Sequence, residues 1–271
     1  MKKLTLILPD IHHKVDRADK IIQHVGADEV ICLGDAFDDF DDTPEMVSHT
    51  AEWFVDFVNK PNHIFIGGNH DWHYAYDIPH LRCSGYEQWK SFIINDVVSK
   101  RDWEKMKFYH FLDGKWLLSH GGLHKFHLPK KIAELHADRP KFMNELEAYL
   151  TEESYKAFRE DSWFLHAGHS RGGIQRVGGL TWCDHNQEMY PIIGLHQIYG
   201  HSPQQAGSAS WLIQDSENSQ PYFELSNGWS PSNTQLNTTK TSYNLCLDVW
   251  KNMHYATWDG LRLLIYKFND I

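Results

Sequence analysis

Short apolar runs recur along the chain, and each is followed by polar side chains that can bind a metal ion. The runs are Leu4–Leu8, Val30–Leu33, Ile64–Ile66, Trp116–Leu118 and Gln197–Tyr199, and the residues after them include Asp10, His12, Asp35, Asn69, His120 and His201. Runs of this length that end at Gly or Pro predict buried β-strands. Because sites in open α/β sheets form outside the carboxyl ends of the strands, we expect these side chains to gather at one rim.

Helical patterns separate the first three predicted strands. Asp16 is expected to cap a helix that ends at Val25, and Thr43-Pro44 predicts the start of a second helix that ends at Asn59. The resulting β-α-β-α-β order predicts parallel strands joined by right-handed crossovers.

The rest of the chain predicts two hairpins and a more varied mixture of elements. The dipeptides Asp113-Gly114 and Asp259-Gly260 each separate two strand-like runs, as in β-hairpins. A helix over 86–99 should bury Trp89, Phe92, Ile93 and Val97. Residues 129–166 have a mostly helical pattern, and further strands are expected near 180–183, 196–200, 209–213 and 245–249.

The segment 216–244 is rich in Ser, Asn, Gln, Thr and Pro, which predicts a long surface loop. Four tryptophans in this part of the chain are expected in the core or as loop anchors: Trp211, Trp229, Trp250 and Trp258. With no internal repeat or linker, we predict one α/β domain over residues 1–271.

Composition narrows the class of protein. Of the 271 residues, 41% are hydrophobic and 23% are charged, as in ordinary soluble proteins, and no apolar run reaches membrane-spanning length. The formal net charge of −10 argues against stable nucleic-acid binding and against attachment to anionic membranes. The four cysteines are scattered, which favours reduced thiols. We therefore expect a cytoplasmic protein.

The side chains after the predicted strands also indicate which metals would bind. Carboxylate and amide oxygens suit hard divalent ions, whereas imidazole suits manganese, iron and zinc. The set lacks the thiolates that are typical of structural zinc sites. A pair of ions can lower the pKa of a bound water and hold the oxygens around a phosphorus atom. We expect two divalent or trivalent ions, with manganese first and iron or zinc as alternatives.

Five ordered motifs resemble those of a known family. They are Asp10-x-His12, Gly34-Asp35-x-x-Asp38, Gly68-Asn69-His70-Asp71, His120-Gly121-Gly122 and Gly200-His201-Ser202. In this order they resemble the calcineurin-like metallophosphoesterases, closest to the phosphoprotein phosphatase branch with its bacterial and phage-type protein phosphatases and diadenosine tetraphosphatases. Leu247-Asp248 resembles the last strand of that branch. The resemblance implies two mixed β-sheets packed as a sandwich and flanked by helices.

The resemblance also implies a role for each matching residue. Asp10 and His12 would bind the first metal ion, Asp35 would bridge both ions, and the second ion would be bound by Asn69, His120 and His201. A hydroxide that bridges the ions would attack phosphorus. His70 would be the general acid, oriented and kept cationic by Asp38.

The chain departs from the family pattern in ways that affect substrate binding. Asp38 is followed by Asp39-Phe40 where the family has Arg-Gly, so one phosphate-binding arginine is missing. Arg171 resembles the family's other phosphate-binding arginine, with Arg176 as the rival. Asp71 stands where the protein phosphatases have Glu. The chemistry is left intact, and the substrate class is left open.

Plainer explanations compete with these roles. The ligand set could consist of residues that merely start turns, Asp38 could belong to a solvated acidic loop, and His169 could be a further ligand or, as we favour, a loop residue. The aromatic segment 72–76 could stack a nucleobase, but we favour packing of the loop. Most of the 19 histidines, including His73, His185 and His196, should be surface or satisfied core residues.

The combined expectation is a phosphomonoesterase, with a phosphoserine/threonine protein as the first choice of substrate. The alternatives are a nucleotide pyrophosphohydrolase or phosphodiesterase of the diadenosine tetraphosphatase type, and a non-catalytic metal-binding module. The expected partners are therefore a phosphorylated protein, a nucleotide or a small phosphoester, and neither nucleic acid nor a membrane.

Overall fold

The first β-sheet contains the three parallel strands expected at the start of the chain. The computed structural model describes residues 3–205, 207–218, 220–226, 229–249 and 253–268. Its five-stranded sheet has the order β11-β10-β1-β2-β3, with β1 at Thr5–Leu8, β2 at Glu29–Cys32, β3 at His63–Phe65, β10 at His254–Trp258 and β11 at Leu263–Lys267. β1 and β2, and β2 and β3, pair in parallel, whereas β10 pairs antiparallel with β1 and β11. The parallel β-α-β-α-β start and the hairpin at Asp259-Gly260 are confirmed.

The second sheet is also mixed. Its six strands have the order β4-β5-β6-β9-β7-β8, with β4 at Tyr109–Leu112, β5 at Trp116–Ser119, β6 at His196–Tyr199, β7 at Ser210–Asp215, β8 at Tyr222–Leu225 and β9 at Thr241–Cys246. β5, β6 and β9 are parallel, and the outer pairs are antiparallel. The expected hairpin at Asp113-Gly114 joins β4 to β5.

The two sheets share a buried core, because alternate residues of a strand point to opposite faces. Ile7 of β1 and Ile31 of β2 lie in one cluster with Trp116 of β5 and Leu245 of β9. The same cluster holds Trp211 and Trp258, with Trp229 packed against it, as expected, whereas Trp250 lies outside the described residues. The sandwich of two mixed sheets is thus confirmed.

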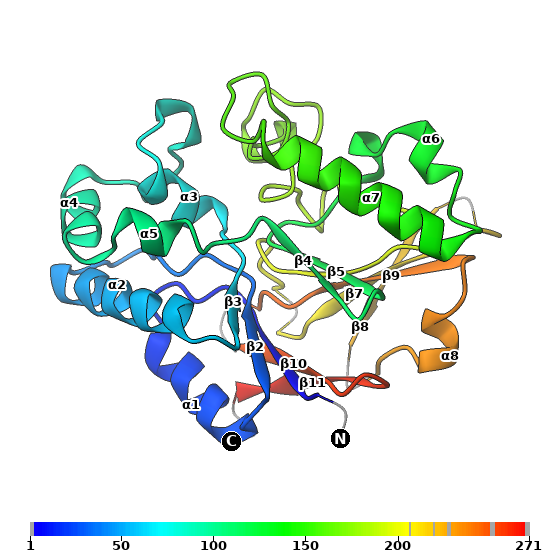
Figure 1. Cartoon of the computed structure of the whole chain (residues 1–271), viewed down its shortest axis with the longest axis horizontal. Helices are drawn as coiled ribbons and strands as arrows, with labels where there is room; N and C mark the ends of the chain where they lie inside the picture. The colour runs from blue at the N-terminus through cyan, green and yellow to red at the C-terminus, as the bar shows by residue number, and fades with distance from the viewer. Residues whose placement is uncertain (1–2, 206, 219, 227–228, 250–252, 269–271) are drawn as a thin grey trace.

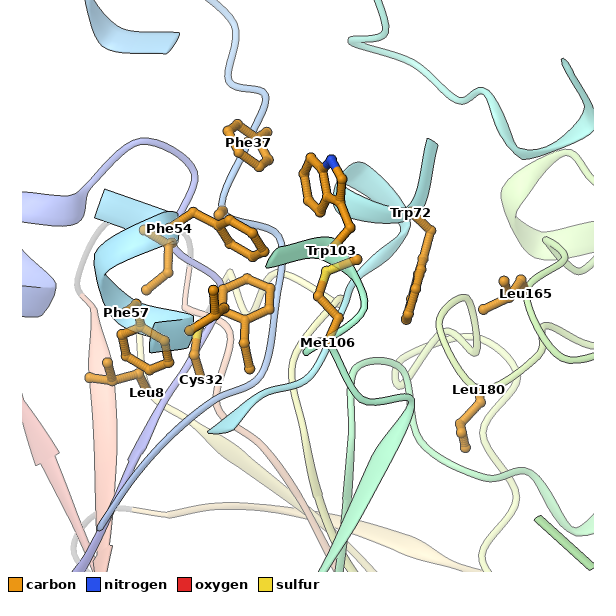
Figure 2. Packing of buried hydrophobic residues seen from close by; sticks show 14 of the residues in the cluster. Leu8, Cys32, Phe37, Phe54, Phe57, Trp72, Trp103, Met106, Leu165 and Leu180 are labelled. Atoms are coloured by element: carbon orange, nitrogen blue, oxygen red, sulfur yellow. The ribbon is translucent and has the colours of Figure 1, made fainter. Parts of the chain in front are cut away.

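The outer face of the first sheet is covered by α2 (Pro44–Asn59), which begins and ends where the sequence predicts. Leu8 and Cys32 of the sheet lie close to Phe54 and Phe57 of this helix (Figure 2). The Phe54 ring centroid is 4.8 Å from that of Trp103. Full burial of one such side chain contributes about 1.5–3 kcal/mol, so this face anchors the helix.

The remaining helices flank both sheets (Figure 1). They are α1 Val15–Val25, α3 Asn69–Ala75, α4 Gln88–Val97, α5 Lys100–Trp103, α6 Lys130–Ala133, α7 Arg139–Ser154 and α8 Asn233–Leu236, with 3-10 turns η1 Pro79–Leu81, η2 Lys125–His127 and η3 His169–Arg171. Thr151 of α7 is hydrogen-bonded to Tyr109 of β4, so α7 lies beside the second sheet. Among the described helices, none combines the length and apolar character that a bilayer crossing requires.

Two helix predictions were wrong in detail. The residue before α1 is Lys14, and Asp16 lies inside the first turn rather than at the cap, where its charge still favours the helix N-terminus. On α4 the predicted inner face is rotated, since Phe92 is 69% exposed whereas Lys90 and Ile94 are buried. A hydrophobic pattern counts Lys as polar, and it cannot foresee that Lys90 has buried acidic partners.

The predicted loop over 216–244 and the predicted strand over 245–249 were also wrong. The segment contains β8, α8 and the start of β9, which runs over Thr241–Cys246 instead of 245–249. β8 is an edge strand whose four residues are all exposed, so it lacks the alternation of apolar and polar residues that predicts strands.

The segment 180–183 forms turns instead of the expected strand, because its apolar residues fill space in a loop. Trp182 N–H, for example, donates to Gly179 O. Within 129–166, α6 and α7 are separated and followed by turns.

Candidate active site

Six polar residues predicted from the sequence meet at the carboxyl ends of strands from both sheets. β1 leads to Asp10 and His12, β2 to Asp35, and β3 to Asn69 at the start of α3. The second sheet contributes His120 directly after β5 and His201 two residues after β6. Five of these residues line one cavity of about 440 Å³, and His120 lies fully buried against it, 3.1 Å from Asp35. The site therefore spans the junction of the two sheets.

The donor atoms form two clusters that share Asp35. One contains Asp10, His12 and Asp35, and the other contains Asp35, His120 and His201, with donor atoms within 4.8 Å of one another in each. His120 Nε2 is 3.1 Å from Asp35 Oδ2 and 3.2 Å from Asn69 Oδ1. His12 Nε2 is 3.9 Å from Asp35 Oδ2. A carboxylate common to both clusters is the arrangement that a pair of ions needs.

The histidines are oriented as metal ligands usually are. His120 Nδ1 lies 2.8 Å from the carbonyl oxygen of Leu33, and His12 Nδ1 lies 2.5 Å from that of Asp38. Hydrogen bonds from Nδ1 to carbonyl oxygens leave Nε2 as the ligand atom. His201 Nε2 is buried without a hydrogen-bond partner in the described part of the chain. These side chains therefore fit a dinuclear metal centre.

The electrostatics of the cavity also favour cations. Burial, followed by the neighbouring Asp248, raises the pKa of Asp10 well above its usual value. Burial opposes ionisation of Asp35 too, but His120 and His70 outweigh it and lower the pKa of Asp35. Asp248 lies just beyond β9 and lines the cavity, and burial followed by the charge of Asp35 raises its pKa to about 7. A bound cation would stabilise this concentration of buried carboxylates.

The backbone of the site is in an unusual conformation. Six described non-glycine residues have positive φ, and five of them are in or beside the site: His12 at 41°, His13 at 60°, Asp35 at 46°, Asp38 at 64° and His201 at 65°. The left-handed region is costly for residues with a side chain, and such strain often marks functional sites.

Two glycines make room for the ligands. A Cβ atom at Gly68 would lie 2.0 Å from Asp35 Oδ1, and one at Gly200 would lie 1.8 Å from Asp10 Oδ1. Any larger residue at either position would displace a carboxylate. These glycines therefore explain why the motifs read Gly-Asn-His-Asp and Gly-His-Ser.

His70 is paired with Asp38, as the motifs implied. His70 Nδ1 lies 2.9 Å from Asp38 Oδ2, while the hydroxyl of Tyr74 donates to Asp38 Oδ1 at 2.7 Å. Burial disfavours the cation, but Asp35, Cys83 and Asp38 outweigh it and raise the pKa of His70 well above its usual value. Asp38 itself is buried and not part of a solvated loop. Although burial opposes it, hydrogen bonds from the neighbouring histidines lower the pKa of Asp38.

Asp71 holds the backbone of the site in place. Its carboxylate accepts hydrogen bonds from the backbone N–H groups of Gly68, Asp35 and Ala36 at 2.8–2.9 Å. It therefore joins the second and third motifs and holds the loops that carry Asp35 and Asn69.

Sequence reasoning missed three residues around Asp38. Lys90 Nζ is 3.1 Å from Asp38 Oδ1, and His73 Nε2 is 3.1 Å from Asp38 Oδ2. Cys83 Sγ lies 3.2 Å from His73 Nδ1, and the histidines His70 and His73 lower the pKa of Cys83 to about 6 despite its burial. No sequence motif connects these scattered positions. His185 and His196, in contrast, are core histidines with hydrogen-bond partners, as expected.

The cavity also contains cationic side chains. Arg171 lines it and donates from Nε to Asp184 Oδ2 at 2.7 Å. Arg176 lies over the Phe126 ring and is not among the residues that line the cavity. Lys14 and Arg17, which belong to none of the five motifs, also line the cavity. The only sequence signal for them was their position shortly after the first motif. His169 belongs to neither ligand cluster among the described residues.

The aromatic side chains that line the cavity lie outside the segment 72–76. Trp72 stacks on Phe108 with centroids 4.5 Å apart, and Tyr76 packs on Phe158 at 4.0 Å, so the packing explanation for 72–76 is confirmed. Phe40 and Trp182 line the cavity instead.

Comparisons with known proteins agree with this geometry. The family model of the calcineurin-like phosphoesterases matches residues 4–205. A search of curated proteins found no match. Among solved structures, a cold-active protein-tyrosine phosphatase of a psychrophile, Shewanella sp., is 13% identical, with a TM-score of 0.51 over 100% of this chain and 80% of that chain.

Two further solved structures have lower TM-scores. A putative diadenosine tetraphosphatase is 11% identical, with a TM-score of 0.46 over 98% of this chain and 94% of that chain. A protein serine/threonine phosphatase from Saccharomyces cerevisiae is also 11% identical, with a TM-score of 0.44 over 98% of this chain and 80% of that chain. The family model covers most of the chain and its motifs form the cavity, so this protein belongs to the calcineurin-like phosphoesterases and is a metal-dependent hydrolase of phosphoric esters.

Proposed function

We propose that this protein hydrolyses phosphomonoesters with two bound metal ions, and that its first-choice substrate is a protein that carries phosphoserine or phosphothreonine. The main support is that two donor clusters sharing Asp35 lie in the same cavity as the paired His70 and Asp38. The cavity thus offers ligands for cations together with an imidazole that can supply a proton. Phosphate-ester hydrolysis needs both.

The metal ligands follow from the two clusters. Asp10 and His12 would hold one ion, and Asp35 would contact both ions. The other ion would be held by Asn69, His120 and His201. When bound, the ions would acidify a water and neutralise charge on the phosphate oxygens. Manganese is the first choice, with iron or zinc as alternatives, because the donors combine carboxylate and amide oxygens with imidazole.

His70 would protonate the oxygen of the leaving group. Asp38 would hold the proton on Nδ1, which leaves the Nε2–H group for the substrate. Lys90 and Tyr74 hold the Asp38 carboxylate in place through contacts of 3.1 and 2.7 Å. His70 and Asp38 therefore act as one proton-donating unit.

Arg171 and Lys14 would bind phosphate oxygens. Arg171 is positioned by Asp184, and Lys14 Nζ lies 3.3 Å from Asp39 Oδ2. Asp39 occupies the position where the family has its other arginine. Lys14 would therefore supply a positive charge near that place, but as a point charge without the bidentate geometry of arginine.

A nucleotide with a phosphoanhydride bond is the second candidate substrate. It is supported by the apolar part of the cavity, where Trp182 lies with its ring centroid 5.4 Å from that of His201 and Phe40 is 82% exposed. Aromatic rings can stack a nucleobase and contribute about 1–3 kcal/mol per base.

A substrate panel with metal analysis on the same sample tests these proposals. The manganese-loaded protein would be assayed with a phosphoserine peptide, a phosphotyrosine peptide, an aryl phosphate monoester, an aryl diester and a dinucleoside tetraphosphate. We expect the highest kcat/KM on a monoester. A preference for the tetraphosphate that is lost in Trp182→Leu would establish the second candidate instead. Failure on every substrate with two ions bound would support the non-catalytic alternative.

The cytoplasmic location of the protein stays a prediction.

A further inference from the structure

A third group of metal-binding donors lies beside His70, outside the two clusters that share Asp35. Cys83 Sγ is 3.2 Å from His73 Nδ1 and 3.8 Å from His70 Nδ1. One donor atom of each residue lies within 4.8 Å of the other two. In tetrahedral zinc sites, bonds of about 2.3 Å to sulfur and about 2.0–2.1 Å to nitrogen place these ligands roughly 3.5 Å apart. The distances from Cys83 Sγ to the two histidine nitrogens are therefore close to those between ligands of one ion.

The fold holds these donors firmly. His70 and His73 are three residues apart on α3 and therefore lie on the same face of the helix. The segment that carries Cys83 is fixed to α3, because the rings of Tyr74 and Tyr86 stack with centroids 5.5 Å apart. Of the four cysteines, Cys83 alone is not fully enclosed, since the other three are buried.

The other nitrogen of His73 already contacts a carboxylate. His73 is 1% exposed, and its Nε2 lies 3.1 Å from Asp38 Oδ2. A metal on Nδ1 of His73 would leave an Nε2–H group to donate to this carboxylate. That arrangement of carboxylate, histidine and metal is common in zinc proteins.

We propose that His70, His73 and Cys83 form a third, inhibitory metal site for zinc or another thiophilic divalent ion. Cys83 would bind as the thiolate, and Nδ1 of His70 and of His73 would bind without a proton. Any proton on these three atoms would go to solvent. A water would complete the coordination. The sulfur ligand distinguishes this site from the dinuclear centre, whose donors are oxygen and nitrogen.

Occupation of the site would remove the proton donor. With a metal on Nδ1, His70 could no longer pair with Asp38 as an imidazolium, and its remaining Nε2–H would be a much weaker acid. This inhibitory consequence rests on the role of His70 under the proposed function, whereas metal binding itself does not. The two parts can therefore fail separately.

Cobalt spectroscopy tests the binding. We would titrate the metal-free protein with Co²⁺ and follow the thiolate-to-cobalt charge-transfer band in the near ultraviolet. We expect the band in the wild type, its loss in Cys83→Ala, and its retention in Cys32→Ala, which removes a thiol buried in the core. No band at any cobalt loading would overturn the proposal, and so would a band that persists in Cys83→Ala.

A second binding measurement uses only the wild type and so does not depend on how the variants fold. Zn²⁺ should protect Cys83 from iodoacetamide, as followed by mass spectrometry of the peptide that contains it. Alkylation of Cys83 at the same rate with and without Zn²⁺ would overturn the proposal.

Turnover tests the inhibition. Zn²⁺ added to the manganese-loaded enzyme should lower turnover of an aryl phosphate, and this loss, relative to each protein's own activity, should be smaller in Cys83→Ala than in Cys32→Ala. Equal zinc sensitivity in both variants would place the inhibition at the dinuclear centre and refute an inhibitory third site, even if cobalt binds to Cys83.

Discussion

The buried ion network around Lys90 yields a quantitative prediction. Lys90 Nζ contacts Asp38 Oδ1 at 3.1 Å and Asp42 Oδ2 at 2.5 Å, and all three side chains are only 3% exposed. The substitution Lys90→Met keeps most of the apolar stem but removes the ammonium group. The two buried carboxylates would then lose their shared cation. Asp38 would retain His70 and His73, whereas Asp42 would retain only His13, whose pKa is lowered by burial.

The expected cost is large because the network is buried. Removing one partner of a buried ion pair typically destabilises a protein by about 3–5 kcal/mol. Since total stability is typically about 5–15 kcal/mol, Lys90→Met should lose a major part of it. The matched control is Lys100→Met, which breaks the contact with Glu104 on a side chain that is 89% exposed. Exposed pairs of this kind contribute about 0–1 kcal/mol.

Urea unfolding followed by circular dichroism would measure both variants. The buffer should contain EDTA, because metal binding adds to the apparent stability of the folded state. We also expect Lys90→Met and Asp42→Asn to be non-additive by about 1–3 kcal/mol, since the two residues are in direct contact. A loss below about 1 kcal/mol in Lys90→Met would contradict the reasoning, because it would mean that the carboxylates do not need the ammonium group.

Three further predictions concern the candidate site and the response to acid. His70→Asn should retain both metal ions while kcat falls roughly 10²–10⁴-fold, the range for loss of a general acid, and normal turnover with bound metal would refute that role. Asp35→Asn should instead lose metal, as measured by elemental analysis after dialysis, and full occupancy would contradict the shared-carboxylate assignment. Burial opposes ionisation of Asp102, but bonds from Ser99, Asn59 and Lys105 lower its pKa to about 2. Because this folded-state pKa lies below the unfolded one, Asp102 stabilises the protein above about pH 4 and loses its contribution as the pH falls towards 2. Asp102→Asn should therefore cost about 2 kcal/mol at pH 7 and less near pH 3, and a pH-independent difference between the two proteins would refute this.

Much of the site could be predicted because its signals are local. Each ligand follows a short apolar run, and strands buried on both faces leave such runs in any sequence. The parallel order of the first three strands then brings Asp10, Asp35 and Asn69 to one edge. His120 and His201 also follow apolar runs, but their assignment to the second metal ion needed the resemblance between motifs, because the packing of two sheets leaves no local signal.

The residues that sequence reasoning missed depend on contacts between distant segments. Lys90 is 52 residues from Asp38, and a lysine on a helix is normally assigned to its exposed face. Cys83 and His73 were likewise read as ordinary residues, since their importance comes only from their position beside His70. β8 was missed for a different reason, because an edge strand exposed on both faces has no hydrophobic alternation to detect.

The left-handed backbone at the site has a consequence for sequence drift. Asp35, Asp38 and His201 are constrained twice, once by their chemistry and once by a φ of 46–65° that costs most residues about 1–2 kcal/mol. A library of variants selected only for folding should therefore recover glycine and asparagine at these positions and exclude valine and isoleucine. A related protein that lost catalysis would keep the same backbone conformation. Glycine or asparagine at these three positions of a related chain would therefore indicate lost activity in an unchanged fold.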